Sequence, residues 1–177
     1  MFADRLTPRQ SELLEAHYQL LIRWNKTLNL TRIEEREQAI ERHYGESLFL
    51  ADHLPPGPLR IADIGSGAGF PGFPIAVVRP DCQVTLIESH QRKSVFLKEA
   101  ARELPNVRVV AKRAEVVSAR FDIAVSRAVS YADLDKPLHA LAPVAYLLSG
   151  AEEPPWPAET IPSPLGKHQF LRIIRFT

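Results

Sequence analysis

The feature that most constrains the fold is a glycine cluster placed directly after an apolar run. Residues 61–72 have the sequence Ile-Ala-Asp-Ile-Gly-Ser-Gly-Ala-Gly-Phe-Pro-Gly, with glycines at positions 65, 67, 69 and 72. Glycine permits a positive φ and close approach of a ligand to the backbone, and a following helix offers unpaired N–H groups. This pattern is typical of a nucleotide-type cofactor site at the first strand–loop–helix unit of a parallel α/β fold.

Glu88 strengthens this interpretation, because it follows the next predicted strand at 19 residues after Gly69. A carboxylate at that place can accept hydrogen bonds from both hydroxyls of a ribose. The glycines also satisfy the G-x-G-x-x-G pattern of dinucleotide sites, but that match alone is weakly specific.

Three features favour S-adenosylmethionine over a dinucleotide. The cluster begins as early as Gly65, Asp63 precedes it on the predicted strand, and Pro71 restricts the turn where a dinucleotide fold would start its helix. This cofactor carries an ammonium and a sulfonium instead of a pyrophosphate, so a carboxylate near the loop suits it. We therefore expect Asp63, Gly65, Gly67, Gly69 and Glu88 to bind the cofactor.

The elements around this loop predict a Rossmann-like α/β fold, with a mainly parallel sheet and helices on both faces. A capping box at Thr7-Pro8-Arg9-Gln10 begins one N-terminal helix, and a second is expected from about Glu35 to His53. The clearest later helix is expected from about Arg92 to Leu104. Strands are expected at 59–64, 83–87, 107–111, 121–126, 144–148 and 169–176, with a restrained proline-rich loop over 154–164.

The 177 residues fit one domain. We expect an N-terminal helical extension over residues 1–54, a Pro-Pro-Gly-Pro linker, and a cofactor-binding core over 59–177. The single cysteine, Cys82, excludes an internal disulfide, and no apolar stretch reaches the length of a membrane span. Without a signal-peptide pattern, we expect a cytoplasmic protein with no membrane partner. The histidines show no metal-ligand spacing, so no metal site is expected.

The net charge of +1 does not by itself indicate a polyanionic partner. The charge is unevenly placed, however. Residues 89–113 contain seven Lys or Arg and two Glu, whereas residues 33–52 contain six acids and two Arg. Solvated helix faces explain this as well as an RNA-binding surface does.

The chain resembles the ribosomal RNA small-subunit methyltransferase G family, also called glucose-inhibited division protein B. The resemblance extends over nearly the whole chain and is far more specific than a generic glycine loop. It rests on Trp24-Asn25-x-x-Leu28-Asn29-Leu30-Thr31, Arg42-His43-x-x-Glu46-Ser47, the run from Asp63 to Pro74, Glu88-Ser89-x-x-Arg92-Lys93-x-x-Phe96-Leu97, and Ser126-Arg127-Ala128.

The resemblance implies methyl transfer from S-adenosylmethionine to N7 of a guanine in 16S ribosomal RNA, by a monomer acting on the RNA or the small subunit. It implies that Gly65 and Phe70 contact the cofactor, Glu88 its ribose, and Ala114-Glu115 its adenine end, and that Arg127 closes the site. Because guanine N7 has a free lone pair and no proton, no general base is required. We therefore name no catalytic residue, but Arg127 and His43 as positioning candidates and Arg42, Arg92 and Lys93 as RNA-binding candidates.

The sequence departs from the family pattern at three places. Glu46 stands where the family commonly has Asp, Ser149 stands where it usually has Lys, and residues 150–167 look shortened. Two alternatives therefore stay open. One is a methyltransferase acting on another RNA or on a small molecule, and the other is a cofactor-binding protein that has lost turnover.

Overall fold

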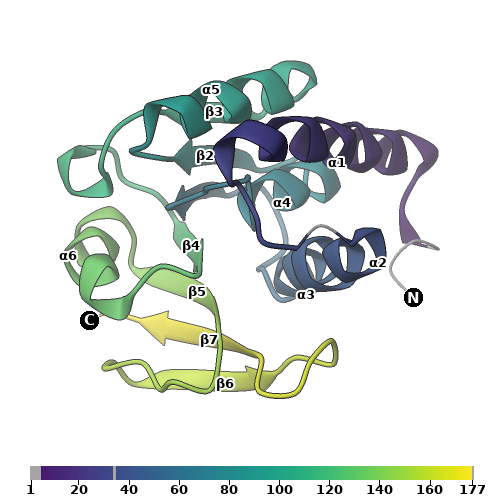
Figure 1. Ribbon diagram of the computed structural model, residues 1–177. Helices are drawn as coiled ribbons and strands as arrows, with labels where there is room; N and C mark the ends of the chain where they lie inside the picture. The colour runs from purple at the N-terminus through teal and green to yellow at the C-terminus, as the bar shows by residue number, and fades with distance from the viewer. Residues whose placement is uncertain (1–4, 34, 177) are drawn as a thin grey trace.

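Seven strands form one mixed sheet at the centre of the molecule (Figure 1). The computed structural model describes residues 5–33 and 35–176. The strand order is β3-β2-β1-β4-β5-β7-β6. The strands are β1 (Arg60–Ile64), β2 (Gln83–Ile87), β3 (Val107–Val110), β4 (Ile123–Arg127), β5 (Val144–Ser149), β6 (Ala158–Pro162) and β7 (Phe170–Arg175).

The first five strands are parallel, and β7 and β6 continue the sheet antiparallel. The chain proceeds outward from β1 through β2 to β3 and then returns to β4 on the other side of β1. Ile64 at the end of β1 is paired with Ser126 of β4. This reversal of direction opens a crevice beyond the carboxyl ends of β1 and β4, where open α/β sheets bind ligands.

The helices include one long N-terminal element and several short ones between strands. They are α1 (Pro8–Leu28), α2 (Arg36–Ala39), the π-helical segment η2 (Ile40–Gly45), α3 (Glu46–Asp52), α4 (Gly72–Val78), α5 (Gln91–Ala100), the 3₁₀ turns η3 (Ala101–Glu103) and η4 (Ala114–Val116), and α6 (Tyr131–Leu141). The predicted capping box is present at the start of α1, where Thr7 and Gln10 exchange hydrogen bonds.

Helices cover both faces of the sheet, as the sequence predicts, but unequally. On one face, buried side chains of α1, α3, α4 and α5 form a single core with residues of β1, β2, β4, β5 and β7. On the other face, α6 supplies Leu134, Leu138 and Leu141 to a smaller core. The N-terminal helices therefore share one core with the sheet.

The predicted strands lie within about two residues of the observed ones, but two other expectations need correction. The proline-rich stretch 154–164 is not only a loop, because it contains β6. β6 is an edge strand and ends at Pro162, and prolines are tolerated at sheet edges, where a missing N–H breaks no ladder.

The helix expected over residues 35–53 is continuous from Arg36 to Asp52, but its middle is the π-helical segment η2. The helix expected from Arg92 to Leu104 is α-helical over Gln91–Ala100 and ends in a 3₁₀ turn. Hydrophobic periodicity does not separate these helix types over one or two turns.

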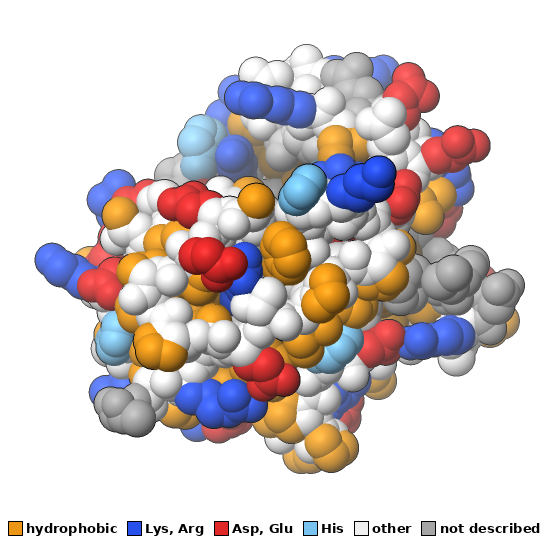
Figure 2. Space-filling model, turned by 90° about the horizontal axis from the view of Figure 1, so that it is seen from below, with side chains coloured by type: hydrophobic (Ala, Val, Ile, Leu, Met, Phe, Trp, Pro, Cys, Tyr) orange, Lys and Arg blue, Asp and Glu red, His pale blue; other side chains and the backbone are white. Residues whose placement is uncertain are grey.

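The two charged segments lie in different parts of the molecule. Figure 1 places α5 and β3 at the top and α2 and α3 at the lower right. On the face seen from below, basic and acidic side chains are interspersed among apolar ones (Figure 2). That face therefore carries no extended field of one sign.

Candidate functional site

The glycine loop leaves β1 in a conformation that favours glycine. Gly65, Gly67 and Gly69 have φ values of +72°, +55° and +93°. The backbone N–H groups of Gly65 and Ser66 both donate to the Ile87 carbonyl, at 2.9 and 3.1 Å, so the loop is tied to the end of β2. A Cβ atom at position 65 would lie 2.6 Å from Cγ2 of Val129. Only glycine therefore fits at this entrance to the crevice.

Asp63 lies behind the loop and is fully buried. Its Oδ2 accepts a hydrogen bond from the Gly72 N–H at 3.0 Å, at the start of α4, while Oδ1 has no partner within the described chain. Burial raises the pKa of this carboxyl group to about 7. The structure thus places Asp63 where it holds the loop against α4.

Glu88 follows β2 and is also turned toward the loop. Its Oε2 accepts from the Gly67 N–H at 2.9 Å and its Oε1 accepts from the His90 N–H at 2.7 Å. Each carboxylate oxygen has a second lone pair for another donor. The distance between the loop and Glu88 is therefore fixed by direct bonds.

A cavity of about 220 Å³ lies beside Gly65 at the ends of β1 and β2. Of the predicted cofactor residues, Gly65, Ala114 and Glu115 line it. The others do not: Asp63, Gly67, Gly69, Phe70, Glu88 and Arg127. The cavity is lined by Ile64, Gly65, Ile87, Ser89, Lys112, Arg113, Ala114, Glu115, Val129 and Asp133.

Sequence reasoning missed Val129 and Asp133 in this wall. Val129 follows Ser126-Arg127-Ala128 directly, so that motif pointed to it. Asp133 is the third residue after Ser130, whose hydroxyl accepts from the Asp133 N–H at the start of α6. That Ser-x-x-acid pattern was visible as a helix-start signal.

Phe70 belongs to an aromatic cluster beneath the loop. Its ring stacks on His43, with ring centroids 4.7 Å apart, and contacts the edges of His17 and Tyr44. His17 Nε2 donates to the Ala68 carbonyl at 3.0 Å, and its Nδ1 accepts from the Tyr44 hydroxyl at 2.6 Å. Complete burial lowers the pKa of His17 to about 4. A neutral histidine of α1 therefore holds the loop from below.

The residues of three sequence motifs meet at His43. Arg127 Nη1 donates to His43 Nδ1 at 2.7 Å, because a guanidinium can only donate. The ring proton is then on Nε2, which donates to Thr31 Oγ1 at 2.7 Å. Burial, with the Arg127 charge as a further cause, lowers the pKa of His43 to about 3. The imidazole is neutral and its tautomer is set.

Glu46 completes this network between two arginines. Its Oε2 lies 3.3 Å from Arg127 Nε and its Oε1 lies 3.3 Å from Arg42 Nε. Burial raises the pKa of Glu46, and the two arginines oppose this shift. Burial lowers the pKa of Arg127, because burial disfavours the charged form of either group. The structure thus brings Arg42, His43 and Arg127 together at the end of β4.

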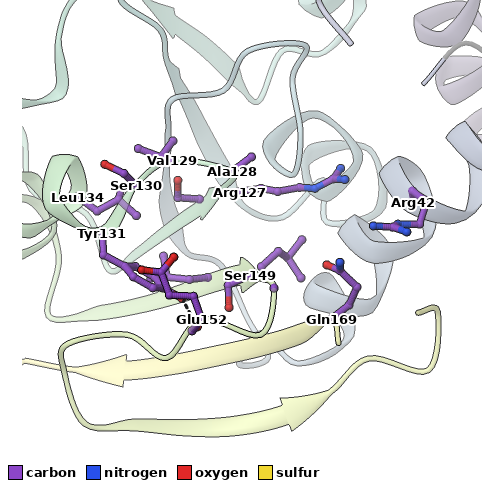
Figure 3. A pocket seen from close by; sticks show the side chains of 14 residues that line it. Arg42, Arg127, Ala128, Val129, Ser130, Tyr131, Leu134, Ser149, Glu152 and Gln169 are labelled. Atoms are coloured by element: carbon purple, nitrogen blue, oxygen red, sulfur yellow. Dashed lines mark hydrogen bonds between the residues drawn. The ribbon is translucent and has the colours of Figure 1, made fainter. Parts of the chain in front are cut away.

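A second cavity, of about 320 Å³, opens at the carboxyl ends of β4 and β5 (Figure 3). Val129 lines this cavity as well as the one beside Gly65, so it stands where the two meet. Ser149, one of the residues at which the sequence was expected to depart from the family pattern, also lies in this wall. The cavity is lined by Arg42, Ser126, Arg127, Ala128, Val129, Ser130, Tyr131, Leu134, Leu147, Leu148, Ser149, Gly150, Glu152 and Gln169.

The remaining RNA-binding candidates lie apart from this cavity. Arg92 and Lys93 are in the first turn of α5, just after Glu88, with Arg92 exposed and Lys93 half-buried. Arg42, in contrast, belongs to the wall of the second cavity.

In the described residues, no group of three or more His, Cys, Asp or Glu side chains is placed to hold a metal ion. Among the helices of residues 5–33 and 35–176, none is both long and apolar enough to cross a membrane.

The chain is similar to curated proteins named ribosomal RNA small subunit methyltransferase G. It is 45% identical to that of Chromobacterium violaceum over 132 residues, which is 72% of this chain and 63% of the relative. It is 49% identical to that of Dichelobacter nodosus over 130 residues, 70% of this chain and 61% of the relative. The matches thus span about three fifths of these relatives' length.

Solved methyltransferase structures share the fold at low sequence identity. A methyltransferase from Aquifex aeolicus described as SAM dependent has a TM-score of 0.60 at 16% identity, covering 84% of this chain and 97% of that one. A putative S-adenosyl-L-methionine-dependent methyltransferase from Methanococcus maripaludis has a TM-score of 0.62 at 14% identity, covering 90% of this chain and 91% of that one.

The family assignment rests on a model matched over most of the chain. The GidB family model, described as rRNA small subunit methyltransferase G, matches residues 10–143 and so ends just before β5. This match includes the glycine loop, Glu88 and the residues of the His43 network. The chain therefore belongs to the rRNA small subunit methyltransferase G family.

Proposed function

We propose that this protein transfers a methyl group from S-adenosylmethionine to N7 of a guanine in 16S ribosomal RNA. The observation that carries the proposal is the pair of adjoining cavities at the carboxyl edge of the sheet, which meet at Val129. One is bounded by the glycine loop and the other by Arg127. A donor and an acceptor placed in these two cavities would approach each other at that residue.

The residues of the first cavity fit the proposed cofactor. A side chain at position 65 would collide with Val129, so glycine lets Val129 pack closely against the loop at the edge of this cavity. Glu88 would hold the ribose, while Ala114 and Glu115 would hold the adenine end. The carboxylates of Glu115 and Asp133 in the cavity wall, and of Glu88 between the lining residues Ile87 and Ser89, suit a ligand that carries positive charge. S-adenosylmethionine supplies an electrophilic methyl group on a sulfonium.

The main role of the chain's own residues is to orient the acceptor. Guanine N7 already has a free lone pair, so no side chain has to remove a proton. Catalysis then depends on alignment and on exclusion of water. Arg127 is the proposed positioning residue at the end of β4, and His43 holds it through the 2.7 Å bond to Nη1. Asp63, Gly67, Gly69 and Phe70 shape the loop from behind and below.

RNA would be held along the same edge of the sheet. Arg42 lies at the second cavity, and Arg92 and Lys93 lie at the start of α5, next to the proposed ribose site. Positive side chains on both sides of the reacting groups are the arrangement expected for phosphate contacts.

Two assays test the proposal. Calorimetry is expected to detect binding of S-adenosylhomocysteine and no binding of NAD. Labelled S-adenosylmethionine is then offered with naked 16S RNA, with assembled small subunits, and with unrelated RNA, and the product is mapped by mass spectrometry. Methylation of a 16S guanine at N7 is expected. Transfer to unrelated RNA alone would point to another acceptor.

A cofactor-binding protein without turnover is the second candidate, and Ser149 favours it. This residue replaces the usual family lysine in the wall of the second cavity. Tight binding of S-adenosylhomocysteine with no transfer to any of these RNAs is the result that this candidate predicts.

We further propose that residues 1–177 act as one domain and as a monomer in the cytoplasm, where ribosomal subunits are assembled. The shared core of the N-terminal helices and the sheet supports the single domain. Light scattering after size-exclusion chromatography is expected to give a mass near 19.9 kDa.

A further inference from the structure

The second cavity has distinct chemistry on its different walls. Tyr131, Leu134 and Leu147 form apolar wall, and Arg42 and Arg127 supply positive charge. Glu152 supplies the one carboxylate of the described lining residues. Figure 3 shows Glu152 at the lower side of the cavity, across from Val129 and Ser130. The carboxylate therefore lies away from the side that adjoins the glycine loop.

The loop that carries Glu152 is attached to α6. The Tyr131 hydroxyl donates to the Glu152 carbonyl at 3.1 Å. The following Glu153 pairs with the buried Arg172 of β7 at 2.8 Å. These two contacts hold the backbone at position 152 between α6 and the sheet.

Ser149 belongs to the same cavity wall. Its Oγ atom is buried and has no hydrogen-bond partner within the described chain, so it is shielded from a ligand in the cavity. Glu152, in contrast, is exposed and can meet a ligand directly.

We propose that Glu152 determines base specificity by accepting hydrogen bonds from N1–H and the N2 amino group of the acceptor guanine. The inference rests on the proposed function and adds a residue to it. These two donors lie on the side of the base opposite N7, so N7 would face Val129 and the cofactor cavity when they face Glu152. Adenine has an acceptor at N1, which a carboxylate disfavours. Glu152 lies outside residues 10–143, the region matched by the family model.

The test compares guanosine with inosine, which lacks the N2 amino group, at the methylated position of the same RNA. Wild type is expected to prefer guanosine by about tenfold in kcat/KM. Glu152→Ala is expected to reduce this ratio toward one, and Glu152→Gln to lose activity mainly on guanosine. Glu159→Ala, which removes an exposed carboxylate on β6, is the matched control and should keep the wild-type ratio.

A binding measurement gives the same comparison without turnover. The protein saturated with S-adenosylhomocysteine is titrated with guanosine and inosine monophosphates, and Glu152→Ala is expected to make their affinities equal. An undiminished preference for guanosine in Glu152→Ala overturns the inference. Failure of wild type to methylate any guanine would instead count against the proposed function, and the two failures are therefore distinguishable.

Discussion

At the scale of single residues, the two carboxylates predicted to bind the cofactor also hold the loop. Asp63 is fully buried and accepts from the Gly72 N–H, and Glu88, also buried, accepts from the Gly67 and His90 N–H groups. A carboxylate that fixes backbone amides pre-organises a binding loop. Asp63 therefore contacts the loop region through the Gly72 backbone N–H.

Replacing Glu88 tests its proposed contact with the ribose. Glu88→Ala removes charge-assisted hydrogen bonds and is expected to weaken S-adenosylhomocysteine binding by roughly 2 to 4 kcal/mol in calorimetry. Glu88→Gln keeps one acceptor oxygen and should lose less. The thermal unfolding of each variant checks that the fold persists, with Glu159→Ala as the control. Wild-type affinity in Glu88→Ala would show that the ribose lies elsewhere.

The buried His17 makes stability depend on pH. Its pKa of about 4 in the folded protein lies below the ~6.5 of an unfolded chain, so the unfolded chain binds a proton that the native state excludes. Its stabilising contribution is therefore full above pH 6.5 and is lost as the pH falls toward 4. The stability difference between wild type and His17→Gln is expected to shrink by about 2 to 3 kcal/mol between pH 6.5 and 4.5.

Urea unfolding at several pH values measures this difference. The control is His139→Gln, because the His139 side chain is half exposed and lies on α6 away from the loop. This variant controls for the loss of an imidazole outside the aromatic cluster. A pH-independent difference for His17→Gln would contradict the prediction.

At the scale of elements, the π-helical segment η2 connects the end of α1 to the end of β4. It carries His43, which contacts Thr31 on one side and Arg127 on the other. π-helical turns within helices are frequent at functional sites. Here the segment places His43 between Thr31, which follows α1, and Arg127 at the end of β4.

Thr31→Val tests this connection. The substitution leaves the His43 Nε2–H without its acceptor, which is expected to cost about 1 to 3 kcal/mol of stability. If His43 positions Arg127, kcat/KM for methyl transfer should also fall by roughly tenfold, a loss of about 1.4 kcal/mol, with the affinity for S-adenosylhomocysteine unchanged. Thr31→Ser retains the hydroxyl and should restore both. Equal behaviour of the Val and Ser variants would exclude the hydrogen bond as the cause.

At the scale of the whole molecule, positive and negative side chains nearly balance, so the molecule as a whole has little net charge. The net charge is +1, and basic and acidic side chains are interspersed on the face drawn in Figure 2. RNA binding by such a protein depends on a few well-placed cations instead of a general field. The candidates are those along the carboxyl edge of the sheet.

Neutralising Arg92 and Lys93 together tests that edge as an RNA surface. RNA binding should weaken while cofactor affinity stays unchanged, and the slope of log affinity against log salt should become shallower by about 1 to 2, at ~0.7 per single-strand phosphate. Neutralising Lys98 and Arg102, toward the other end of the same helical stretch, is the control. An unchanged slope would assign the RNA surface to other residues, with those of the N-terminal helices next to be tested.

The sequence alone determined the strand–loop–helix unit, the mainly parallel sheet and the family. These follow from local patterns, because hydrophobic period, glycine placement and motif spacing are all readable within a few dozen residues. Local patterns did not predict β6, because its prolines indicate a loop. This strand forms through its pairing with β7.

Only the tertiary structure decided which distant residues meet. Arg127 and His43 are 84 positions apart, and Thr31, His43, Glu46 and Arg127 form one network because η2 packs beside the end of β4. The placement of Glu152 opposite Val129 likewise depends on how the loop after β5 is held by α6. Such contacts arise from packing and from sheet register, and a one-dimensional pattern contains neither.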